Sequence, residues 1–368
     1  MQDTLKEKLK MLQQTAKERT VKTQSIEYDL ETLVKKIKKG FIKLNPDYQR
    51  NHRWKESTSS KLIESLILNI PIPVIYLSED VDVDDDIDDD IARYSVIDGQ
   101  QRLTAITDYM SNKFALTDLD VLSDLNGSFY NDLPPFLIRR LEERTIKCLR
   151  IDSTVDSQVK YDIFERLNSG AVELTAQELR NAIYRGNFNN LIKELAKDSN
   201  FRKLLNISGD LENNTKVKKM EDIELVLRFF ALDNENYNNL KKGFKKFLSS
   251  EMEKFNKYNT EQLKEMEKRF RKTMKIICDS LGELAFAKYK YEKGKYIKMS
   301  NFNAAVYDAI AISVSSELVA KNKKIDQKKV DELKKLFSNK KFFDAVSGSV
   351  NDKEKVKTRI KLVTEVLS

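Results

Sequence analysis

The chain has 368 residues, of which 40% are hydrophobic and 34% are charged, and its formal net charge at pH 7 is +8. This length accommodates two compact units with separate cores, and the composition is typical of a globular protein rich in surface helix. No apolar run approaches the roughly 20 residues needed to span a bilayer, and residues 1–8 lack the apolar core of a signal peptide. We therefore expect a cytoplasmic protein with no membrane partner.

Two residue counts exclude several kinds of chemistry. The chain has one histidine, His52, and no serine or cysteine motif is recognisably paired with it. An HNH nuclease, a Ser-His-Asp hydrolase and a histidine-based zinc site all need histidine in a specific constellation, so we expect none of them. Cys148 and Cys278 lie far apart in sequence, which indicates buried reduced thiols rather than a disulfide framework or a zinc cluster.

Much of the negative charge lies in one segment, because residues 82–90 contain seven aspartates. Without this segment, 66 basic residues would face 51 acidic ones, which leaves +15. Such an excess permits contact with DNA through its phosphates, although lysine-rich helical faces also serve solubility. We interpret residues 82–90 as a solvated loop and DNA as a possible partner.

The first eighty residues predict alternating helices and strands. Residues 1–20 place leucines at helical spacing among charges, which predicts an amphipathic helix. A short strand and then a helix are expected over 26–40, with Gly40 placed to end that helix. A stronger helical pattern covers 57–69, and a buried strand follows over 72–77.

The segment Asp98–Arg102 comes directly after an apolar strand and opens a helix. Gly99 lets the backbone turn and approach a ligand closely, and the N–H groups at the start of the helix favour a bound anion. Arg102 adds a charged fork suited to phosphate oxygens, and the two glutamines between them donate and accept hydrogen bonds. The segment predicts a phosphate-binding turn, although Asp98 with Gln101 three residues later also fits an ordinary capping box.

Later segments predict one more strand and then mostly helix. Residues 145–151 alternate as a strand does, and a helix is expected over 159–167. Thr175–Glu178 has the pattern of a capping box that opens the next helix, which Gly186 is placed to close. From about residue 187 onward strand signals fade, which favours a helical bundle or a helical extension.

Three polar segments occur in order: Tyr48–Trp54, Asp98–Arg102, and Phe164–Gly170 with Leu174–Asn181 behind it. Together they resemble the bacterial domain of unknown function that forms the N-terminal half of GmrSD-type restriction enzymes and of related anti-phage proteins. The resemblance covers roughly residues 25–190 and implies a fold similar to ParB and sulfiredoxin.

The expected fold class is therefore α+β. Residues 1–24 would form a helical extension, residues 25–190 a ParB/sulfiredoxin-like nucleotide-binding domain, and residues 191–368 a mostly helical domain. In GmrSD-type fusions a C-terminal HNH domain cuts the DNA, but no histidine follows His52 in this chain. The resemblance thus implies a separate nuclease or defence effector as a partner.

The resemblance also implies roles for the residues of the turn. In the ParB and sulfiredoxin folds the corresponding loop handles nucleotide phosphates, which implies binding, and in characterised relatives hydrolysis, of a nucleoside triphosphate with Mg²⁺. Gly99 and Arg102 would contact phosphates, while Gln100 and Gln101 would orient phosphate or water. Asp98 would fix the turn or hold the metal ion, so Asp98, Gln101 and Arg102 are the candidate catalytic residues.

Flanking residues supply further candidates. Gln49 and Arg50 lie in a polar loop, and Arg50 could bring a second cation to the phosphates. Asn168 could contact the ligand through its amide, with capping of its helix as the alternative. Trp54 could stack on a base, but anchoring the next helix to the core is the preferred interpretation. For Arg180 we prefer an ordinary surface cation.

Two functions compete with nucleotide binding and hydrolysis in anti-phage defence. One is a ParB-like module that binds DNA through lysine and arginine, and the other is a scaffold that keeps the fold without hydrolysing nucleotide. The nucleotide hypothesis predicts that Arg102→Ala weakens triphosphate binding. The DNA hypothesis predicts an affinity that falls steeply with salt and survives this substitution.

Overall fold

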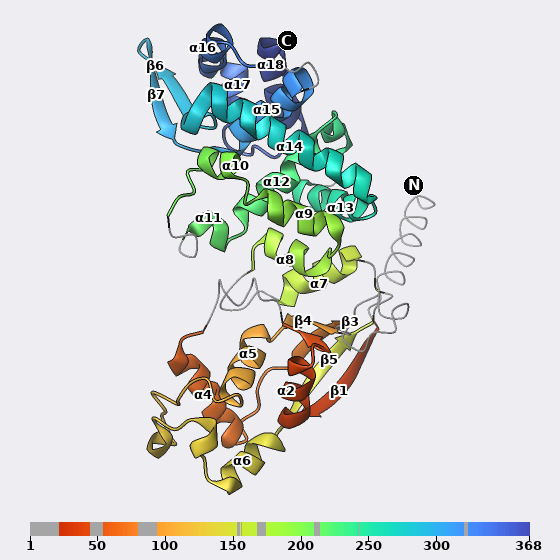
Figure 1. Ribbon diagram of the computed structural model, residues 1–368, viewed down its shortest axis with the longest axis vertical. Coiled ribbons are helices and arrows are strands. Elements are labelled where there is room, and N and C mark those ends of the chain that lie inside the picture. The colour runs from red at the N-terminus through yellow and green to blue at the C-terminus, as the bar shows by residue number, and fades with distance from the viewer. Residues whose placement is uncertain are drawn as a thin grey trace, which may run out of the picture. The chain divides into compact units, whose positions relative to one another are not determined.

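The computed structural model describes residues 22–44, 54–79, 94–152, 155, 157–167, 174–209, 214–241, 243–319 and 323–368. The chain folds as two compact units, Met1–Leu174 and Thr175–Ser368 (Figure 1). The helix expected over 1–20 and the aspartate segment 82–90 lie outside the described residues. The domain limits 25–190 and 191–368 stay a prediction.

The first unit is built on a five-stranded sheet with the order β1-β5-β3-β4-β2. Its strands are β1 (Thr23–Asp29), β2 (Ile42–Lys43), β3 (Ile75–Glu79), β4 (Tyr94–Asp98) and β5 (Thr145–Ile151). β1 pairs with β5 and β3 with β4 in antiparallel register, whereas β3 pairs with β5 and β2 with β4 in parallel register. This mixed sheet with its helices confirms the α+β class.

One face of the sheet shares a hydrophobic core with helices. The helices are α2 (Leu30–Lys38), α4 (Glu56–Ile67), α5 (Gln100–Tyr109) and α6 (Pro135–Glu142). Ile75, Leu77 and Cys148 point into this core from β3 and β5 and are at most 1% exposed. Because side chains alternate along a strand, Ile97 points the other way, where β4 contacts α7 (Ser157–Leu167).

Most elements predicted for this unit are confirmed. The strand over 145–151 has the expected limits, and Gly40 ends its helix at φ 78° with its N–H donating to the Ile37 carbonyl at 3.0 Å. The strand predicted from 72 begins later, at Ile75. Pro71 and Pro73 precede this start, and proline has no N–H for a sheet ladder.

The second unit is mostly helical, as predicted. Its helices are α8 (Ala176–Ile183), α9 (Asn187–Leu195), α10 (Ser199–Leu204), α11 (Thr215–Lys218), α12 (Glu221–Leu232), α13 (Phe244–Asn256), α14 (Thr260–Leu281), α15 (Ala304–Val314), α16 (Gln327–Lys335), α17 (Lys340–Ala345) and α18 (Lys353–Leu367). Aromatic rings pack edge to face in its core, with Phe229 and Phe270 at 5.2 Å between centroids. Such packing adds about 0.5–1.5 kcal/mol per pair beyond the area buried.

A charged cluster is sealed inside this helical unit. Asp308 accepts hydrogen bonds at 2.5 Å from both Arg228 and Arg359, and the three side chains are 0–5% exposed. Burial alone raises the pKa of Asp308, but attraction to the two arginines outweighs it and holds that pKa below its usual value.

Three features of the second unit differ from expectation. A two-stranded hairpin, β6 (Lys288–Glu292) and β7 (Lys295–Ser300), lies within the region where strand signals fade. Gly186 does not close α8, which ends at Ile183, but precedes α9 as its N-cap. Arg180 is 1% exposed rather than a surface cation, because Gln177 and Glu224 both accept from it at 3.0 Å.

Candidate functional site

The Asp98–Arg102 turn connects the end of β4 to the start of α5. Gly99 has φ 97°, and a Cβ at this position would lie 2.2 Å from Cδ1 of Ile75, so no other residue fits without a shift. Gly99 is itself the N-cap, and having no side chain it cannot cap the helix. The alternative of a capping box formed by Asp98 and Gln101 is therefore wrong.

Backbone amides at the first turn of α5 precede the helical hydrogen-bond ladder, as predicted. The helical ladder begins with the N–H of Leu103, which donates to the Gly99 carbonyl at 2.9 Å. The amides of residues 101 and 102 therefore lie outside the ladder, at the end of the helix that carries a partial positive charge. Such a helix start favours a bound anion.

The guanidinium of Arg102 binds three protein acceptors. Its Nη2 lies 2.6 Å from Oδ2 of Asp98, and its Nη1 donates to the carbonyls of Pro73 and Val74 just before β3. The Arg102 side chain is 11% exposed and that of Asp98 33% exposed. Burial lowers the pKa of Arg102, although the adjacent Asp98 carboxylate partly opposes this. Arg102 thus ties the turn to the neighbouring strand.

Gln101 carries a buried donor beside these amides. Its Oε1 accepts from the backbone N–H of Trp54 at 3.1 Å, and the residue is 9% exposed. Within the described part of the chain its Nε2 has no hydrogen-bond partner. Buried amides are nearly always paired, so this group calls for an explanation. Gln100 is also buried, at 6% exposure.

The structure brings together five of the eight predicted site residues, since Asp98, Gly99, Gln100, Gln101 and Arg102 all belong to the turn. The other three, Gln49, Arg50 and Asn168, lie outside the described residues. Trp54 packs against the core of the first unit, which is the role preferred for it above.

Sequence reasoning missed two kinds of contact around the turn. The acceptors for Arg102 include backbone carbonyls, and a carbonyl leaves no signature in the amino-acid pattern. Burial raises the pKa of the Cys148 thiol on β5 to about 11, although nearby Arg102 lowers it in part. A neutral thiol therefore faces the guanidinium at neutral pH. Cys278, expected to be buried, is only partly so.

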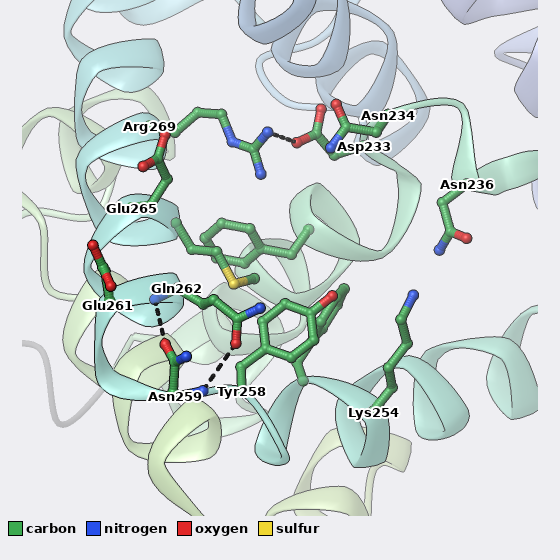
Figure 2. A pocket seen from close by; sticks show the side chains of 13 residues that line it. Asp233, Asn234, Asn236, Lys254, Tyr258, Asn259, Glu261, Gln262, Glu265 and Arg269 are labelled. Carbon is green, nitrogen blue, oxygen red and sulfur yellow. Dashed lines mark hydrogen bonds and ion pairs between the residues drawn. The ribbon is translucent and has the colours of Figure 1, made fainter.

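A cavity of about 570 Å³ lies in the second unit, among α12, α13 and α14 (Figure 2). Phe230, Phe255, Tyr258 and Met266 give it an aromatic and apolar lining. The polar lining residues are Asp233, Asn234, Asn236, Lys254, Asn259, Glu261, Gln262, Glu265 and Arg269. None of the predicted site residues is among them.

The charges of this cavity do not suit a triphosphate. Asp233 and Arg269 form an ion pair at 2.9 Å, and burial raises the pKa of Asp233 although Arg269 partly lowers it. Figure 2 shows the two side chains facing each other across the top of the cavity. With Glu261, Glu265 and Lys254 the lining holds three acidic and two basic groups. The excess carboxylate would repel a phosphate group.

The sheet, its helices and the glycine turn form an α+β domain. Residues 30–185 match the family described as the GmrSD restriction endonuclease, N-terminal domain. The match contains β3, β4, β5 and the whole turn. It points to restriction, a form of anti-phage defence, as the resemblance implied.

No curated protein matches the chain. In the part of the chain that the structure describes, no helix has both the length and the apolar character needed to cross a bilayer.

Proposed function

We propose that the first unit binds a nucleoside triphosphate with Mg²⁺ at the Asp98–Arg102 turn, and that binding and hydrolysis of this nucleotide control a restriction system. One observation carries the proposal: among the described residues the buried Nε2 of Gln101 lacks a partner, and it belongs to the first turn of α5, where the amides of residues 101 and 102 lie outside the helical ladder. A phosphate group has the acceptor oxygens that these donors require.

Arg102 would serve both the fold and the ligand. A guanidinium has five N–H donors, and the contacts with Asp98, Pro73 and Val74 use three of them. The remaining donors would face phosphate oxygens. Asp98 keeps a 33% exposed side chain, and its carboxylate is the kind of oxygen ligand that Mg²⁺ takes together with phosphates.

We propose that another protein or domain cuts the DNA. Residues 186–368 contain no histidine, so they do not form an HNH nuclease. We propose a partner nuclease or defence effector that responds to the nucleotide state of this protein.

Isothermal titration of the purified protein with GTP, CTP, UTP and ATP, each with Mg²⁺, tests the proposal, and phosphate release tests hydrolysis. Gln101→Glu keeps an acceptor for the N–H of Trp54 but brings negative charge to the phosphate site. We expect it to weaken binding at least about 10-fold, the size of losing one charge-assisted contact. Gln262→Glu, an equal charge change on α14, is the matched control and should bind as the parent does. Failure of all four nucleotides to bind would end the proposal.

A further inference from the structure

The hairpin β6–β7 stands at one side of the helical unit (Figure 1). Its two-residue turn has Lys293 at φ 49° and Gly294 at φ 78°, the positive angles that a tight hairpin turn requires. Tyr289 packs against Phe337 with 5.5 Å between ring centroids. Because side chains alternate along each strand, the tyrosine face packs on the helices and the opposite face carries Lys290 and its cross-strand partner Ile297.

The surface of this hairpin is both basic and apolar. Residues 288–300 contain five lysines and one glutamate, a net charge of +4. Tyr291, Ile297 and Met299 are 45%, 51% and 53% exposed, and they are three of the eight large hydrophobic residues that the described part of the chain exposes. Among the described residues Lys290 pairs with Glu292 at 2.8 Å, whereas Lys293, Lys295 and Lys298 form no ion pair.

Protection of an exposed strand edge does not account for this combination. Lysines on an edge strand do prevent pairing with other chains, and they are common there for that reason. A hairpin protected only against pairing with other chains would not also expose Ile297 and Met299 on its outward face, because apolar side chains on a strand promote association. A surface that keeps both features fits a partner that is negatively charged and offers apolar contact.

We propose that the β6–β7 hairpin binds double-stranded DNA. A two-stranded ribbon, with strands about 4.8 Å apart, enters the major groove, which is about 12 Å wide. Lys293 at the turn and Lys295 on the outward face contact backbone phosphates, while Ile297 and Met299 on that face contact sugars and base edges. This site belongs to the helical unit and does not depend on the nucleotide proposed for the first unit.

Fluorescence anisotropy with a labelled 20-base-pair duplex, measured over a series of KCl concentrations, tests this site. The variant K293Q/K295Q removes two hairpin charges, and K264Q/K268Q removes two exposed lysine charges from α14 as the matched control. We expect the hairpin variant to lose about 10-fold or more in affinity at 0.1 M KCl. Its slope of log affinity against log salt should fall by up to about 1.8, since each phosphate contact contributes about 0.9.

The remaining variant tests the apolar contact. I297S/M299S should weaken binding several-fold with an unchanged salt slope, and an unaltered affinity would overturn this part of the proposal. Equal losses in the two lysine variants would mean diffuse attraction and would overturn the whole. The proposal would also be overturned if the protein did not bind the duplex, or if the hairpin bound phosphatidylserine vesicles instead of DNA. Nucleotide titration of the same variants should match the parent, which separates this site from the Asp98–Arg102 turn.

Discussion

Each unit contains an aspartate that forms an ion pair with arginine: Asp98 with Arg102 in the first, and Asp308 with two arginines in the second. The two sites differ in their exposure to water. In the helical unit the side chains of Asp308, Arg228 and Arg359 are 0–5% exposed. Both arginines form an ion pair with the Asp308 carboxylate at 2.5 Å. In the sheet unit Asp98 is 33% exposed, and Arg102 is its ion-pair partner among the described residues. The same kind of ion pair is therefore sealed from water in the helical unit, whereas in the sheet unit it reaches the surface at a turn beside a helix start.

Removing the sealed carboxylate should have the largest effect on stability. Asp308→Ala leaves Arg228 and Arg359 buried without their common partner, and an uncompensated buried charge costs about 3–5 kcal/mol. Urea unfolding followed by circular dichroism measures the loss. A change below about 1 kcal/mol would mean that water reaches the cluster, and the contrast with Asp98 would then disappear.

Replacing the turn glycine should come next. Gly99→Ala places a Cβ at φ 97° and 2.2 Å from Ile75, which adds backbone strain and overpacking of about 2–4 kcal/mol in total. Gly209, at φ 75° with open space around a Cβ, is the matched control, and Gly209→Ala should cost only the strain. Equal losses in the two variants would show that Ile75 moves aside without cost.

Asp222 shows what a buried carboxylate does without two arginines. Burial raises its pKa from 3.8 to about 6, so the folded state holds a proton that the unfolded state releases. Stability from this group is present below about pH 4 and is lost as the pH rises to 6, by an amount of about 1–3 kcal/mol. Asp222→Asn should flatten this part of the stability profile between pH 4 and 6. If the slope of unfolding free energy against pH were unchanged in this variant, groups other than Asp222 would cause the pH dependence.

Local features of the fold could be predicted from the sequence, but contacts between distant segments could not. The strand at 145–151, the glycine turn and the capping box of Thr175 and Glu178 all depend on residues within a few positions of one another, and all three are confirmed. Arg180 is buried because Glu224, 44 residues away, accepts from it, and nothing local predicts that partner.

The hairpin was missed for a different reason. β6 alternates lysine with tyrosine, and in β7 the apolar residues Ile297 and Met299 lie on the exposed face, so neither strand shows the buried apolar alternation on which a strand prediction depends. In the candidate site the turn itself was predictable because glycine, glutamine and arginine follow an apolar strand. The anchoring of Arg102 on the carbonyls of Pro73 and Val74 was not, since it depends on how β3 pairs with β4.

The smallest expected stability effect belongs to the open pair, and it separates the two uses of aspartate most sharply. Asp98→Asn keeps the shape of the side chain but removes the ion pair with Arg102, which at this exposure costs less than about 1 kcal/mol. Asp120→Asn, which removes the exposed pair with Lys61, is the control for an aspartate with no proposed ligand. If Asp98 serves Mg²⁺ and the nucleotide, Asp98→Asn lowers triphosphate affinity at least about 10-fold, while Asp120→Asn leaves it unchanged. A fall in unfolding free energy as large as that of Asp308→Ala, with nucleotide affinity intact, would assign Asp98 to the fold alone.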